Sequence, residues 1–148
     1  MHGFKDVLTR WVQYLQPQRI IEWGPGLSTA LMLQHAPTAR IISIEHDEVW
    51  HTKAREQFGE QITLLLKSAT ARNSSYATEA FRHGPFDLAF VDGRRRVECC
   101  LVAMYLMRPG GVVILHDVCR DNYMRPLRLI ADIIELKSNT AVMRLKAR

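Results

Sequence analysis

The regular alternation of short apolar runs with helical segments limits the fold of this chain more than any other feature. Five runs rich in Ile, Val, Leu or Phe are bounded by Gly, Pro or charged residues, as buried strands are. They cover residues 19–23, 40–45, 62–66, 86–91 and 112–116. Helices are expected between them, at 28–35, 48–58, 74–82 and 96–107, with Ser28 and Asp47 available as helix caps. This βαβ alternation predicts a doubly wound, mostly parallel sheet with helices on both faces.

The two ends of the chain add further elements. Apolar residues at helical spacing in Phe4–Leu15 predict a helix, within an N-terminal segment 1–16, that covers the edge of the sheet. Near the other end, a helix over 122–129 and an antiparallel hairpin around the turn 137–140 are expected. Because no repeat or linker divides the 148 residues, the sequence predicts one domain, 1–148.

The composition indicates the cellular compartment and the kinds of partner to expect. No apolar run approaches the length of a membrane span, and the N-terminus does not resemble a signal peptide. The three cysteines form no CxxC pair, which favours a reducing compartment, so we expect a cytoplasmic protein. A formal net charge of +5 favours anionic partners, although such an excess commonly serves solubility alone.

A glycine loop after the first strand predicts a ligand site. Gly24 and Gly26 let the backbone turn sharply and approach a ligand, and the following helix offers free N–H donors. Glu45 ends the next strand, where an acid accepts the hydroxyls of a ribose. Dinucleotide sites usually carry a third glycine, where this chain has Thr29, and Glu22 would repel a diphosphate. Glu22 instead suits a cationic group such as the ammonium of S-adenosylmethionine, reached directly or through the loop and water.

The motifs of this chain resemble, in their order, those of class I S-adenosylmethionine-dependent methyltransferases. They are Glu22–Ser28, Ile44–Glu45, Phe86–Gly93 and Arg108–Asp117. The resemblance implies a Rossmann-like sheet of seven strands with the last strand antiparallel, and S-adenosylmethionine as cofactor. Within the superfamily, the motifs are most similar to those of small-molecule and sugar O-methyltransferases.

The resemblance also implies a set of cofactor-binding residues. They are Glu22, Gly24, Pro25, Gly26, Ser28, Glu45, His46, Ser68 and Asp92. In many relatives an acidic residue after the third strand contacts the adenine; this chain lacks it, and Ser68 is the stand-in. The motif of amino-methylating nucleic-acid enzymes is absent, which disfavours methylation of a base nitrogen.

Asp92, His116 and Asp117 are the candidate catalytic residues. The two aspartates end neighbouring strands and should lie side by side, and His116 could act as a base. Regular alternation would place His116 and Asp117 on opposite faces, so one of them could instead cap a helix or orient a loop. Asp92 and Asp117, joined by Asp121 or Asn122, could bind magnesium, but the spacing departs from that of catechol-type relatives, so a metal is not expected.

Arg94, Arg95 and Tyr123 are the candidate substrate-binding residues. Of the three adjacent arginines 94–96, one should contact an anionic group and the others should be solvated. Cys99 and Cys100 should fill the core.

The sequence therefore predicts a methyltransferase acting on an oxygen of a small, anionic molecule. An RNA methyltransferase that uses the basic surface, and a binding protein that keeps the cofactor site without chemistry, remain alternatives. No lid is inserted between the motifs, so the crevice stays open unless the N-terminal helix or the second subunit of a homodimer covers it.

Overall fold

The computed structural model describes residues 3–119 and 121–147, so residues 1 and 2 of the predicted N-terminal segment lie outside it. The side chain of Asp121 is likewise not described. The helices are α1 (Phe4–Leu15), α2 (Leu27–His35), α3 (Glu48–Phe58), α4 (Arg96–Leu106) and α5 (Asp121–Ile130), with short 3₁₀ turns η1 (Gly59–Gln61) and η2 (Thr78–Arg82). The strands are β1 (Arg19–Trp23), β2 (Arg40–Glu45), β3 (Thr63–Leu66), β4 (Phe86–Val91), β5 (Met107–His116), β6 (Ala131–Lys137) and β7 (Thr140–Leu145).

The strands form one seven-stranded sheet in the order β3-β2-β1-β4-β5-β7-β6. The first five pair in parallel, and β7 is antiparallel to both β5 and β6. The order reverses beside β1, so the carboxyl ends of β1 and β4 flank the crevice where such sheets bind ligands. The predicted Rossmann-like sheet, with its terminal hairpin, is confirmed.

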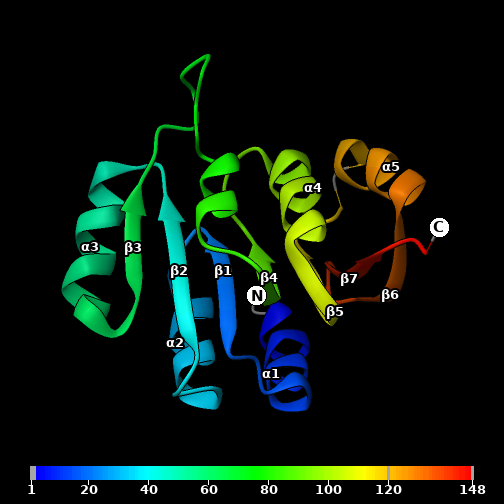
Figure 1. Ribbon diagram of the computed structural model, residues 1–148, viewed down its shortest axis with the longest axis horizontal. Coiled ribbons are helices and arrows are strands. Elements are labelled where there is room, and N and C mark those ends of the chain that lie inside the picture. Colours follow the sequence, from blue (N-terminus) through cyan, green and yellow to red (C-terminus); the bar gives the residue numbers. More distant parts are fainter. Residues whose placement is uncertain (1–2, 120, 148) are drawn as a thin grey trace.

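Helices cover both faces of the sheet (Figure 1). Buried side chains of α1, α2 and α3 pack on one face, and those of η2, α4 and α5 pack on the other. The expectation that α1 covers the edge of the sheet is wrong: Val7, Leu8 and Val12 are fully buried against the face, and Phe4 stacks on Phe90 of β4. The apolar stripe of α1 has no polar interruption, so it buries best against a continuous sheet face.

Two of the predicted helices differ from those in the structure. The segment 74–82 forms only the short η2, because the Ser74 hydroxyl donates to the Ser68 carbonyl and thus holds a loop in place of a helical turn. The helix after Asp92 stops at Leu106, and β5 begins at Met107, where Met107 pairs with Phe86 before a register shift.

The hairpin turn has the conformation that two-residue connections require. Ser138 and Asn139 both have positive φ, of 52° and 58°. Two successive left-handed residues match the twist of the flanking strands. The expected turn at 137–140 is therefore confirmed.

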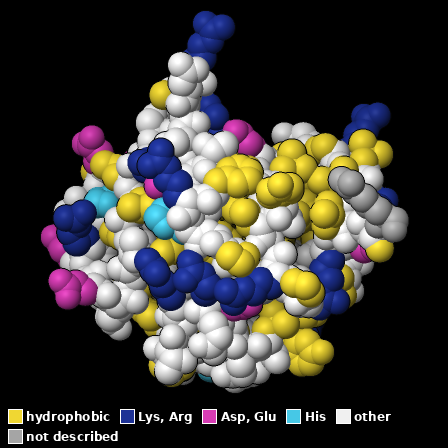
Figure 2. Space-filling view, in the orientation of Figure 1, with side chains coloured by type: hydrophobic (Ala, Val, Ile, Leu, Met, Phe, Trp, Pro, Cys, Tyr) yellow, Lys and Arg dark blue, Asp and Glu magenta, His cyan; other side chains and the backbone are white. Residues whose placement is uncertain are grey.

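Cys99 and Cys100 are fully buried, as predicted, and Cys119 is exposed; all three are free. Figure 2 shows hydrophobic side chains gathered on the face formed by η2 and α4, where Phe81, Leu101 and Tyr105 are exposed. Within the described part of the chain, no helix is long and apolar enough to cross a membrane.

Candidate active site

The two glycines of the first loop have different structural roles. Gly24 has a φ of 87°, and a Cβ there would lie 2.8 Å from the Asp92 carbonyl oxygen. Only glycine therefore allows the loop to approach the end of β4 so closely. A Cβ at Gly26 would meet no atom within 4 Å. The fold needs Gly24, whereas the space over Gly26 is open to a ligand.

Glu22 is fully buried and organises this loop from below. Its carboxylate accepts hydrogen bonds from the hydroxyls of Ser28, Thr29 (2.7 Å) and Ser43 (2.8 Å). Thr29 Oγ1 in turn accepts the Gly26 N–H at 2.9 Å, so the carboxylate fixes the loop through one intervening side chain. Of the two expected ways in which Glu22 could reach the cofactor, directly or through the loop and water, this geometry favours the loop.

Burial also sets the protonation of Glu22. Desolvation raises its pKa to about 7, although the three hydroxyl hydrogen bonds act in the opposite direction. The negative charge of Asp92 raises the pKa further.

Thr29 and Ser43 were missed by sequence reasoning, and Ser28 has a different role from the expected one. Helix α2 begins at Leu27, so Ser28 lies inside the helix and is not its cap. Thr29 stands at the third helical position, where a side chain reaches back to the N-cap N–H. That spacing is a sequence signal for the role of Thr29. Pro25, between the glycines, is partly buried.

Glu45 is buried, and one of its two carboxylate oxygens is already bound. Oε1 accepts the backbone N–H groups of His46 (2.8 Å) and Asp47 (2.9 Å) and lies 3.0 Å from His46 Nδ1. Oε2 has no hydrogen bond or ion pair with any residue of 3–119 and 121–147. Asp47 caps α3 as predicted, accepting the Trp50 N–H at 3.0 Å. The turn thus holds Glu45 rigidly with one acceptor atom to spare.

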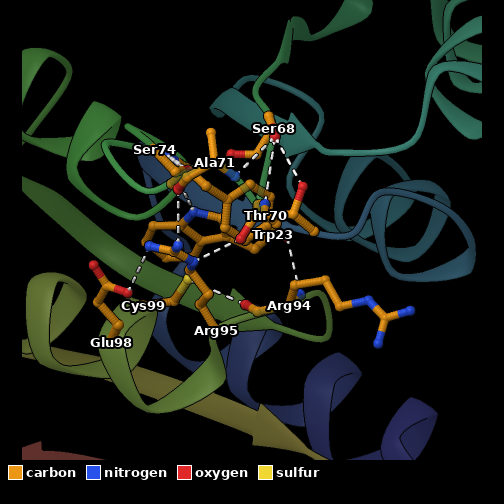
Figure 3. A network of polar contacts seen from close by, with 11 residues as sticks. Trp23, Ser68, Thr70, Ala71, Ser74, Arg94, Arg95, Glu98 and Cys99 are labelled. Carbon is orange, nitrogen blue, oxygen red and sulfur yellow. Dashed lines mark hydrogen bonds and ion pairs between the residues drawn. The ribbon is translucent and has the colours of Figure 1, made fainter.

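The loop between β3 and η2 projects beyond the strand ends and is tied down by Arg95 (Figures 1 and 3). Arg95 Nε donates to the Ala69 carbonyl (2.7 Å), and Nη2 donates to the Ala71 carbonyl (3.1 Å). Ser68 is exposed, and its hydroxyl accepts long hydrogen bonds from backbone N–H groups of its own loop. The predicted adenine contact of Ser68 would therefore come from a side chain already held in a turn.

Tyr76 anchors the end of this loop. It is fully buried, its carbonyl accepts the Trp23 indole N–H at 2.8 Å, and its hydroxyl accepts the Arg94 N–H at 3.1 Å. The ring also lies edge-on to His46, with centroids 6.0 Å apart. Gly93 is required beside it, because a Cβ there would lie 2.0 Å from the tyrosine oxygen.

The strand register changes the expected arrangement of the candidate catalytic residues. Val91 pairs with Leu115, so the residue next to Asp92 across the strands is His116, and Asp117 lies one position further. The expectation that the two aspartates are direct neighbours is therefore wrong in register, because it counted strand ends without the pairing. Asp117 lies beyond the end of β5 with a left-handed φ of 62°, so the regular alternation that was expected does not continue to it. His116 lies against the Phe4 ring at 4.8 Å, whereas Asp117 faces Arg96.

The hydrogen bonding of His116 indicates its tautomer. Thr140 Oγ1 lies 3.3 Å from His116 Nδ1 and donates its hydroxyl hydrogen to the Ser138 carbonyl at 3.1 Å. Because a hydroxyl has a single hydrogen, this arrangement favours Nδ1 as the donor to Thr140. Nε2 then carries the lone pair.

The three adjacent arginines behave differently from the expectation that two are solvated. Only Arg94 is exposed, and its side chain points away from the network in Figure 3. Arg95, a predicted substrate ligand, is used by the loop 68–76. Arg96 is 14% exposed and contacts both candidate aspartates, a role that sequence reasoning missed. The ring of Tyr123 lies 5.7 Å from the Arg96 guanidinium carbon.

This fold, with a glycine loop and two strand-end carboxylates, defines an α/β domain that binds a nucleoside cofactor at the carboxyl ends of its strands. A family model described as a methyltransferase domain matches residues 21–118. The chain belongs to this methyltransferase family, and it is a class I S-adenosylmethionine-dependent methyltransferase domain, as the motif series predicted.

Several solved structures share the fold. A Podospora anserina methyltransferase with bound S-adenosylhomocysteine superposes with a TM-score of 0.77 at 19% identity, covering 97% of this chain and 78% of that chain. The Bacillus cereus O-methyltransferase in complex with S-adenosylhomocysteine has a TM-score of 0.73 at 22% identity, covering 96% and 80%. MycE of the mycinamycin pathway, in complex with magnesium and S-adenosylhomocysteine, has a TM-score of 0.71 at 18% identity, covering 96% of this chain and 46% of that one. A sequence search among curated proteins finds no match.

Proposed function

We propose that this methyltransferase binds S-adenosylmethionine across the glycine loop and Glu45, and transfers its methyl group to an oxygen of a small, anionic molecule. The observation that carries the cofactor site is the Glu45 carboxylate: two backbone N–H groups hold its Oε1, and its Oε2 has no hydrogen bond to the described residues. A vicinal pair of ribose hydroxyls supplies the donors that this acceptor needs. The open space over Gly26 gives the backbone approach that the rest of the cofactor requires.

The remaining cofactor contacts are proposed from the positions of residues beside Glu45 and the glycine loop. His46, 28% exposed and fixed beside Glu45, would flank the adenine, and Ser68 would approach it from the β3–η2 loop. Asp92 lies against Gly24 at the other end of the crevice and would face the methionine part. Bound S-adenosylmethionine would supply the methyl group, and the protein's task would be to align the acceptor with it.

His116 is the proposed base for the acceptor hydroxyl. Its Nε2 carries the lone pair, and its neighbour across the strands is Asp92, which the cofactor would also approach. Asp92 would stabilise the imidazolium that forms when His116 takes the proton, since the two side chains attract electrostatically. The exposed Arg94 follows Asp92 closely and would bind a carboxylate or phosphate of the acceptor.

The small-molecule assignment is supported by the O-methyltransferase among the structural neighbours. An RNA substrate would give binding that weakens steeply with salt, whereas a small acceptor would show little such slope. We also propose a cytoplasmic location, supported by the three free cysteines. A homodimer that covers the crevice stays a prediction, which sedimentation velocity would test.

Calorimetric titration with S-adenosylhomocysteine tests the cofactor site. Glu45→Gln keeps the shape of the side chain but places an NH₂ group where the ribose hydroxyls need an acceptor, so binding should weaken by about tenfold to a hundredfold. Glu56→Gln, an exposed substitution on α3, is the matched control and should bind like the unaltered protein. Titration with NAD is the second control, and binding of NAD in place of S-adenosylhomocysteine would refute the proposal.

A further inference from the structure

Arg96 lies between the two strand-end aspartates. Its Nη2 is 3.4 Å from Asp92 Oδ1, and its Nη1 is 4.0 Å from Asp117 Oδ2. Both aspartate side chains are about one-third exposed, at 30% and 29%, whereas the arginine side chain is 14% exposed. A single guanidinium therefore separates two carboxylates that would otherwise repel each other across the end of the sheet.

Backbone contacts fix this guanidinium in position. Nε donates to the Gly93 carbonyl at 2.9 Å, and Nη1 donates to the His116 carbonyl at 2.7 Å. Arg96 thus bonds to the segments after both β4 and β5, and Tyr123 packs near its other side. A side chain with this many directed contacts does not move aside without leaving several acceptors unpaired.

The same place is where a divalent cation would have to bind if Asp92 and Asp117 were metal ligands, and the residues present do not fit one. Asp117 Oδ1 accepts hydrogen bonds from Asn139 Nδ2 (3.0 Å) and from the Cys119 thiol (3.2 Å), while Oδ2 faces Arg96. Asn122, the third expected ligand, is exposed. Across residues 3–119 and 121–147, no group of three or more His, Cys, Asp or Glu side chains could hold a metal.

We infer that Arg96 is a built-in cation that replaces a divalent metal between Asp92 and Asp117, so that this site binds no magnesium. Two carboxylates and one guanidinium leave one negative charge, whereas a dication would leave none. A net negative site attracts a sulfonium, so the arrangement suits the cofactor without a metal. This last consequence rests on the proposed function; the prediction about metal binding does not.

Titration of the full chain with Mn²⁺, followed by electron paramagnetic resonance, tests the inference. The unaltered protein and Arg96→Lys, which keeps a cation, should leave Mn²⁺ free in solution. Arg96→Ala should gain a site that binds Mn²⁺ at least about tenfold more tightly, because two carboxylates then face each other without a counter-charge. Mg²⁺ should compete for the new site, and adding Asp92→Asn to Arg96→Ala should abolish it.

Several outcomes would overturn the inference. One is Mn²⁺ binding by the unaltered protein that Mg²⁺ displaces and that Asp92→Asn removes. Another is a folded Arg96→Ala protein that gains no Mn²⁺ site. If Arg96→Ala does not fold, the unaltered protein and Arg96→Lys still decide, because metal-dependent stabilisation of either in thermal unfolding contradicts the inference. Titration with S-adenosylhomocysteine, run on the same samples without metal, reports separately on the proposed function.

Discussion

The protonation of Glu22 makes the stability of this protein depend on pH in an unusual direction. Most carboxyl groups in folded proteins favour the ionised form, but burial raises the pKa of Glu22 from 4.5 to about 7. The substitution Glu22→Gln tests this, because an amide has nearly the shape of a protonated carboxyl group and the three hydroxyls can bond to either.

The sign follows from proton binding. Between about pH 4.5 and pH 7 the unfolded chain has released the Glu22 proton, while the folded protein still holds it. The unfolded state thus binds fewer protons, so the free energy of unfolding falls as the pH rises through this window and stays low above it. At about 1.4 kcal/mol per pH unit, a shift from 4.5 to about 7 corresponds to about 3 kcal/mol.

Urea unfolding at pH 5 and pH 8 measures the effect. The unaltered protein should lose about 2–3 kcal/mol relative to Glu22→Gln between these two pH values, because glutamine does not ionise and a small part of the effect is already lost at pH 5. The comparison removes the contributions of other groups that titrate in the same range. Glu56→Gln, at an exposed position of α3, should follow the unaltered protein. If the stability difference between Glu22→Gln and the unaltered protein is the same at both pH values, the reasoning about burial is refuted.

Three further predictions concern the loops and the base. Gly24→Ala should lower the free energy of unfolding by about 1–3 kcal/mol, since it forces an alanine into a left-handed φ and a backbone clash. Gly26→Ala should leave the free energy of unfolding unchanged yet weaken S-adenosylhomocysteine binding in calorimetry, and equal stability losses in the two variants would contradict this division of roles. Arg95→Met should accelerate amide hydrogen exchange in the β3–η2 loop, because two carbonyls lose charged donors, and unchanged exchange there would show that Arg95 does not hold the loop. Nitrogen NMR of His116 should show that the neutral form of the ring is protonated at Nδ1, and the opposite tautomer would disprove the hydrogen bond to Thr140.

The fold was predictable because its signals are local and repeated. Each parallel strand is a short run rich in Ile, Val, Leu or Phe, and the ends of β1, β2 and β4 agree with the structure to the residue. The segment 74–82 was mispredicted, because side-chain hydrogen bonds of Ser74 compete with the helix and depend on a partner six residues away. The position of α1 was mispredicted as well, since an amphipathic stripe shows that a helix is covered but not which part of a sheet covers it.

The positions of the candidate site residues were predictable where a residue lies at the end of its own strand or in the turn that follows. Glu45 and Gly24 follow from motif position alone, because a strand end and the next turn fix where they lie. Glu22 was placed correctly, but its partners were not, since Ser43 belongs to the neighbouring strand and meets the carboxylate only through the β1–β2 register. Interactions across strands need the register, which the apolar pattern of a fully buried strand does not encode.

The three adjacent arginines show most clearly that the sequence pattern does not predict which side chains meet in the fold. In sequence, Arg94, Arg95 and Arg96 are three equivalent basic residues after an aspartate. In the structure, the left-handed φ of 46° at Arg95 turns the chain into α4, so the three side chains leave in different directions: to solvent, to the β3–η2 loop, and between two aspartates. One backbone angle thus decides which guanidinium can meet a substrate and which fills the place of a metal ion. In a regular helix, successive side chains lie about 100° apart, and the three arginines would not have reached both strand ends and the loop at once. Their different roles therefore follow from the backbone conformation and not from the composition.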